Sequence, residues 1–100
     1  MKIPILILAF NRLDEVSVLI KNLKKIEPTK IYFSQDGPRN YIKNDLIKCK
    51  EVKTHVLENI NWKCELKTNF NDTNLGCRKA VSSALNWFFD NEEMGIILED

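Results

Sequence analysis

Strand-like and helix-like patterns alternate along the whole chain, and this alternation limits the fold more than any single motif does. The first pattern, residues 3–9, is a nearly continuous apolar run, which is typical of a central strand covered on both faces. Strands that alternate with helices build a parallel sheet through right-handed crossovers. The sequence therefore predicts a single α/β domain over residues 1–100, with strands at 3–9, 30–34, 62–68 and 94–98.

Capping residues and apolar stripes predict three helices between these strands. Asn11 is the expected N-cap of the first helix, which Glu27-Pro28 ends. The second helix is expected at about 44–59 and the third at 75–89, after Asn74 as N-cap. Residues expected to face the core in these three helices are Leu13, Val16, Ile20, Leu23; Leu46, Val52, Val56, Ile60; and Ala80, Val81, Ala84, Leu85, Phe88.

Composition argues against several functional classes. The 44% hydrophobic content is sufficient for a core, and 15 basic against 14 acidic residues leave neither a nucleic-acid footprint nor a polybasic membrane patch. The cysteines form no Cys-x-x-Cys pair, which argues against zinc and favours a reducing, cytoplasmic location. Pro4 interrupts the only signal-like stretch, and no segment approaches the roughly 20 apolar residues of a membrane span.

Polar or charged segments follow all four expected strands. They are Phe10-Asn11-Arg12, Ser34-Gln35-Asp36-Gly37, residues 69–77, and Glu99-Asp100. In open parallel sheets, ligands bind at the carboxyl ends of the strands, so these segments form the candidate site.

Each feature of the candidate site has a functional and a structural interpretation. Asp36 could bond a base or ribose, or simply stabilise its own Gly-Pro turn. Gly76 and Arg78 open a helix, where free amides suit phosphate, although an ordinary helix start has the same pattern. Glu99 and Asp100 could hold a divalent cation, or could be a solvated strand end.

Taken together, four segments resemble the N-terminal, nucleotide-binding half of GT-A glycosyltransferases. These segments are Pro4–Arg12, Ser34–Gly37, Asn74–Ala80 and Ile96–Asp100. The nearest likeness is to enzymes similar to N-acetylglucosaminyltransferase I and to bacterial family 2-like sugar transferases. The resemblance implies a Rossmann-like parallel sheet with strand order 3-2-1-4. It implies nucleotide contacts by Phe10, Asn11, Arg12, Asp36, Gly76 and Arg78.

The same resemblance implies that Glu99 and Asp100 match the first two positions of an acidic motif that binds Mn²⁺ or Mg²⁺. The partners it implies are a UDP-sugar donor and a glycan or other acceptor, in a metal-dependent transfer to a hydroxyl. The third acidic position and the catalytic base would lie beyond Asp100, so this 100-residue chain is expected to be inactive alone.

Two other classes stay open. A flavodoxin-like or receiver-like signalling module could hold Mg²⁺ at acidic strand ends, but a receiver would carry acidic residues where Phe10-Asn11-Arg12 stands. A nucleotidyltransferase would carry a Gly-rich, Lys-containing segment after the first strand, and that segment is absent from the sequence.

Overall fold

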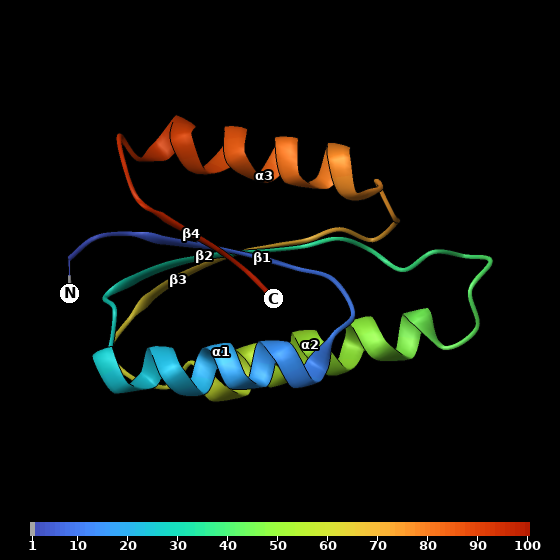
Figure 1. Ribbon diagram of the computed structural model, residues 1–100, viewed down its shortest axis with the longest axis horizontal. Helices are drawn as coiled ribbons and strands as arrows, with labels where there is room; N and C mark the ends of the chain where they lie inside the picture. Colours follow the sequence, from blue (N-terminus) through green and yellow to red (C-terminus); the bar gives the residue numbers. More distant parts are fainter. Residues whose placement is uncertain (1) are drawn as a thin grey trace.

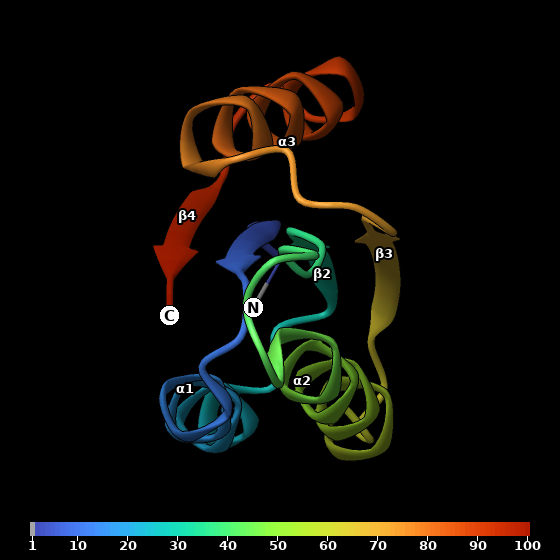
Figure 2. The same ribbon diagram turned by 90° about the vertical axis from the view of Figure 1, so that its right-hand side faces the viewer.

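A computed structural model describes residues 2–100 and shows a three-layer α/β arrangement. A single sheet lies between α3 on one face and the pair α1 and α2 on the other (Figures 1 and 2). The elements follow the predicted alternation: β1 (Ile5–Ala9), α1 (Leu13–Ile26), β2 (Lys30–Gln35), α2 (Asp45–Asn59), β3 (Glu65–Phe70), α3 (Cys77–Asn91) and β4 (Ile96–Glu99).

All four strands are parallel, in the order β3-β2-β1-β4, which confirms the predicted fold class and strand order. The register pairs Ile5 of β1 with Ile31 of β2 on one side and with Ile96 of β4 on the other. β1 is therefore central, and all five of its residues are buried because helices cover both faces of the sheet. Because β1 joins β2 and β4, the chain reverses its direction of travel across the sheet at this strand.

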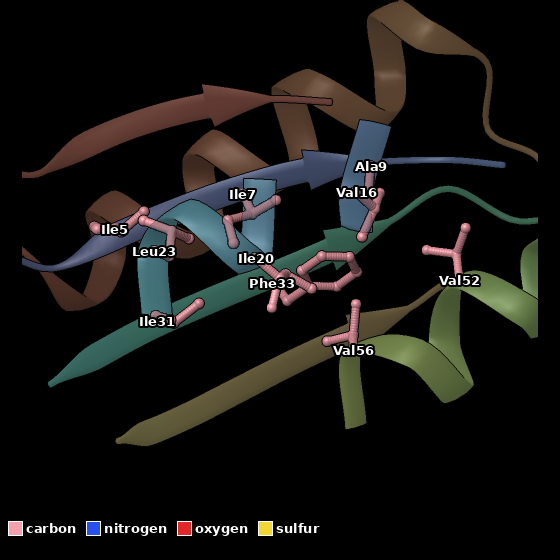
Figure 3. Packing of buried hydrophobic residues seen from close by; sticks show 10 residues of the cluster. All are labelled: Ile5, Ile7, Ala9, Val16, Ile20, Leu23, Ile31, Phe33, Val52 and Val56. Carbon is pink, nitrogen blue, oxygen red and sulfur yellow. The ribbon is translucent and has the colours of Figure 1, made fainter. Parts of the chain in front are cut away.

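The larger core lies between the sheet and the helix pair α1 and α2. Alternate residues of β1 and β2 point into it and meet one face of each helix (Figure 3). Burying each of its Val, Leu, Ile and Phe side chains contributes about 1.5–3 kcal/mol. Its buried members are Ile5, Ile7, Ala9, Val16, Ile20, Leu23, Ile31, Phe33, Val52 and Val56.

The smaller core lies under α3. Leu6, Leu8 and Tyr32 point from the other face of the sheet toward Ala84 and Phe88. The Tyr32 and Phe88 rings meet edge to face, with their centroids 4.9 Å apart. Gly95, just before β4, leaves room for the Phe88 ring, which a Cβ at this position would overlap.

The second helix buries Val52 and Val56 as predicted, but its first two turns differ from the prediction. Leu46, expected in the core, is 54% exposed. The buried positions are Asp45, Cys49, Val52 and Val56, which share one helical face. The prediction was wrong because it excluded a charged residue from the buried face.

The two predicted side-chain caps are also absent. Arg12, not Asn11, is the N-cap of α1, and Gly76, not Asn74, is the N-cap of α3, so this helix begins two residues late. Gly76 has φ +84°, a conformation that favours glycine. The two asparagines make longer-range bonds instead, described below.

Strand ends differ as well. β3 runs over Glu65–Phe70 rather than 62–68. Trp62 is held outside the ladder because its indole Nε1 donates to the Pro28 carbonyl at 2.8 Å. β4 runs over Ile96–Glu99 rather than 94–98 and is an edge strand in which Ile96 and Ile97 are exposed. None of the helices within residues 2–100 has the length and apolar character needed to cross a bilayer.

Candidate functional site

A cavity of about 420 Å³ opens at the carboxyl ends of β1, β2 and β4, beside the start of α3. Its size is within the range of small-molecule sites. Six of the eight residues predicted for the site line this cavity: Phe10, Arg12, Asp36, Gly76, Glu99 and Asp100. Its walls are completed by Leu8, Ala9, Ser34, Arg39, Asn74, Cys77, Ala80 and Val81.

The other two predicted residues lie outside this cavity. The Asn11 side chain turns away and donates to Asp45 Oδ1 at 2.8 Å. Arg78 borders a separate, shallow hollow along α3 with Lys79 and Ser82. The helix start is thus near the cavity through Gly76 and Cys77, while Arg78 faces elsewhere.

Asp36 joins two of the cavity-forming loops. Its Oδ1 accepts hydrogen bonds from the backbone N–H of Gly37 and of Leu75, both at 2.8 Å. Its Oδ2 accepts one from Asn74 Nδ2 at 3.1 Å. The turn-stabilising interpretation of Asp36 therefore describes part of its role. Each carboxylate oxygen offers about two acceptor positions, and Oδ2 uses one of them within the described residues.

Gly37 lets these two loops approach closely. A Cβ at this position would lie 2.5 Å from the Thr73 carbonyl carbon and oxygen, and 2.6 Å from the Asn71 oxygen. Asn74 Nδ2 also donates to the Gly37 carbonyl at 2.9 Å. Sequence reasoning assigned Asn74 to a cap because its partners lie more than thirty residues earlier in the chain.

Gln35 fixes the loop after β1. Its buried Nε2 donates to the Phe10 carbonyl and to the Cys49 carbonyl, both at 2.8 Å. One side chain thereby ties the β1–α1 loop to helix α2. Phe10 is consequently held in place at the cavity wall.

The β4 end brings the acidic pair to the cavity. The Asp100 N–H donates to the Leu8 carbonyl at 3.2 Å, so the backbone continues the β1 pairing. The Asp100 carboxylate is largely buried; Phe10 N–H donates to it over a long 3.4 Å, and Arg12 Nη2 lies 4.0 Å away. Burial raises the pKa of Asp100, and these weak contacts offset only part of that effect.

Arg39 is a cavity residue that the sequence analysis missed. Its Nε and Nη2 donate to the Asp45 carboxylate at 2.8 and 3.2 Å, and its backbone N–H donates there at 2.9 Å. These bonds, with the one from Asn11, hold the pKa of the buried Asp45 well below its usual range. A usable signal was its position, two residues beyond the Ser34–Gly37 segment that was assigned to the site.

The formal charges of the lining favour a cation. Asp36, Glu99 and Asp100 stand against Arg12 and Arg39, which leaves one net negative charge. That excess repels an anionic ligand, and a divalent cation bound together with the ligand would offset it.

The acidic pair suits a hard cation in its chemistry. Within residues 2–100, no group of three or more His, Cys, Asp or Glu side chains is gathered as a ready-made metal site. Magnesium, however, is commonly bound through one or two carboxylates plus substrate phosphates. Glu99 and Asp100 supply that number of oxygen ligands at the cavity.

Comparisons with family models, with curated protein sequences and with solved structures find no match for this chain.

Proposed function

We propose that this chain is the nucleotide-sugar-binding part of a metal-dependent glycosyltransferase of the GT-A type, with a UDP-sugar as donor. The observation that carries the proposal is the single cavity shared by Phe10, Arg12, Asp36, Gly76, Glu99 and Asp100. The sequence resemblance gives these residues nucleotide or metal contacts, and they come from four segments far apart in the chain. The cavity lies at the strand end where β1 separates β2 from β4.

Each lining group has a role that its chemistry allows. The free acceptor position of Asp36 accepts an N–H from the base or a ribose hydroxyl. Arg12, exposed at the rim, contributes positive charge to the diphosphate. Gly76 lets the ligand approach the α3 backbone without a side chain in between.

Glu99 and Asp100 are the residues that would hold Mg²⁺ or Mn²⁺, a Lewis acid that stabilises charge on a leaving diphosphate. The acceptor is a glycan or another hydroxyl compound. A hydroxyl acceptor requires a general base in an inverting reaction, and none of the cavity residues is assigned that role.

The test is an amide NMR titration of the chain with UDP, with and without Mg²⁺. We expect shifts at Arg12, Asp36 and Gly76, and a stronger response when Mg²⁺ is present because the lining is net negative. Cytidine and adenosine diphosphates serve as base controls. Absence of UDP shifts at millimolar concentration in both conditions would refute the proposal. Shifts near Glu99 with Mg²⁺ alone, without any UDP response, would favour the receiver-like alternative.

A variant pair tests the metal role. Asp100→Asn keeps the shape of the side chain and removes its charge, so the gain in UDP affinity on adding Mg²⁺ should fall about tenfold. Asp90→Asn, an exposed residue of α3, is the matched control and should leave that gain unchanged. An equal Mg²⁺ effect in both variants would contradict a metal role for Asp100.

A further inference from the structure

The Arg39 side chain is fixed more firmly than any other cation at the cavity. Two of its guanidinium N–H groups are held by Asp45, whose side chain is only 1% exposed. Its guanidinium carbon also lies 5.2 Å from the centre of the Phe10 ring, within cation–π range. A long side chain held on two sides has already lost most of its rotamer freedom, so it loses little more on binding a ligand.

The same guanidinium has donors to spare. A guanidinium carries five N–H groups, and Asp45 takes one from Nε and one from Nη2. Within residues 2–100, Nη1 donates to no protein acceptor. The side chain keeps about a third of its surface exposed and lines the cavity. Three N–H groups of the guanidinium thus have no acceptor within residues 2–100.

Arg12 differs in each of these respects. Its side chain is 60% exposed, and its Nη2 donates to the Asp100 carbonyl at 3.1 Å. It lies nearest to a carboxylate that the proposed function gives to a metal. A flexible, exposed arginine adds positive charge to the rim but does not present a fixed set of donors.

We propose that Arg39 forms an anion subsite of the cavity that binds a phosphate group, with Asp45 and Asn11 as the residues that position it. Asn11 donates to the carboxylate oxygen that also accepts from Arg39 Nη2, so the β1–α1 loop helps to fix the orientation of the Arg39 guanidinium. Guanidinium groups suit phosphate because their parallel N–H groups match two of its oxygens. That this phosphate is the diphosphate of a nucleotide rests on the proposed function; the subsite itself does not.

The test uses inorganic pyrophosphate and UDP as separate probes, each with equimolar Mg²⁺. The first measurement needs no variant: the Nε–H signal of Arg39, protected by its bond to Asp45, is followed in wild-type protein. Pyrophosphate should shift this signal. Arg39→Gln should weaken pyrophosphate binding by at least about tenfold. Arg39→Lys keeps the charge but loses the parallel N–H groups, so it should weaken binding by a smaller factor. Lys21→Gln, an exposed charge on α1, should bind like wild type.

The outcomes separate the two proposals. A silent Arg39 signal at millimolar pyrophosphate, or equal affinity in wild type and folded Arg39→Gln, would overturn the subsite. An Arg39 response to pyrophosphate without any response to UDP would support the subsite and refute the proposed function. UDP shifts at Asp36 and Gly76 with Arg39 unchanged would support the proposed function and overturn the subsite.

Discussion

Replacing Arg39 with methionine should destabilise the fold strongly, because it leaves a buried carboxylate short of partners. Asp45 accepts four hydrogen bonds, and the substitution removes the two from the guanidinium while the backbone N–H and Asn11 remain. A hydrogen bond to a charged group contributes about 1.5–3 kcal/mol. Because water can enter where Arg39 is exposed, we expect the lower end of the combined range, a loss of about 3 kcal/mol in the free energy of unfolding.

Such a loss should lower the Tm of a 100-residue domain by about 12 °C or more. Urea unfolding followed by circular dichroism measures the free energy directly. The matched control is Arg12→Met, which removes an exposed ion pair spanning 4.0 Å and should cost at most about 1 kcal/mol. Equal losses of stability in the two variants would refute the reasoning, because the burial of Asp45 would then add nothing to the effect of losing an arginine.

The pH dependence gives an independent check with a definite sign. In the wild type, hydrogen bonds from Arg39 lower the pKa of Asp45, so its stabilisation is fully present above the unfolded value of about 3.9 and is lost at lower pH. Without the guanidinium, only the backbone N–H of residue 39 and Asn11 oppose the effect of burial, so the pKa of Asp45 is higher than in the wild type. The deficit of the variant relative to wild type should therefore shrink as pH falls through the raised pKa of Asp45. A deficit independent of pH would contradict this account.

Three further substitutions test the packing around the site and the core, each by urea denaturation. Gly37→Ala should lower the free energy of unfolding by about 1–3 kcal/mol because its Cβ would overlap the Thr73 backbone, and it should change the UDP shifts at the cavity. If the variant were as stable as wild type, the two loops would have to separate freely. Phe88→Ala should cost about 3–5 kcal/mol because the ring is fully buried against Tyr32; a loss below about 1 kcal/mol would mean that α3 packs loosely. Gly95→Ala should cost about 1–3 kcal/mol because its Cβ would overlap the Phe88 ring and approach the Pro4 carbonyl oxygen to 2.7 Å. The cost should be smaller when combined with Phe88→Ala, which removes the ring but leaves Pro4; additive losses would contradict the Phe88 contact.

The fold was predictable because its main determinants are local. A nearly continuous apolar run marks β1 as the doubly covered strand, and strand–helix alternation specifies the parallel connections. The prediction that Val16, Ile20 and Leu23 lie on the buried face of α1 was also confirmed, because their spacing is helical and uninterrupted. The edge of the sheet that carries the candidate site could be predicted from topology alone, because the carboxyl ends of parallel strands lie together.

The parts that were missed depend on contacts between distant residues. The Asn11–Asp45 bond spans 34 positions, and the Asn74–Asp36 bond spans 38. Nothing local distinguishes these asparagines from helix caps, because the same amide serves both purposes. Asp45 was missed for a related reason: its helical position matches Cys49, Val52 and Val56, but a carboxylate is buried only when a partner such as Arg39 is available.

The placement of buried polar groups links the stability of the fold to the proposed site. Ser34, Gln35, Asp36 and Asp45 are the buried polar residues within 2–100, and all lie at or after the carboxyl end of β2. Burying such groups costs free energy unless every one is hydrogen-bonded, and none of their buried atoms lacks a partner. An apolar set would stabilise this end of the sheet at least as well. The polar groups instead fix the orientation of groups at the cavity wall. Their hydrogen bonds hold the Phe10 backbone, the Asp36 carboxylate and the Arg39 guanidinium in place. A site that must bind a charged ligand gains from groups already oriented before the ligand arrives.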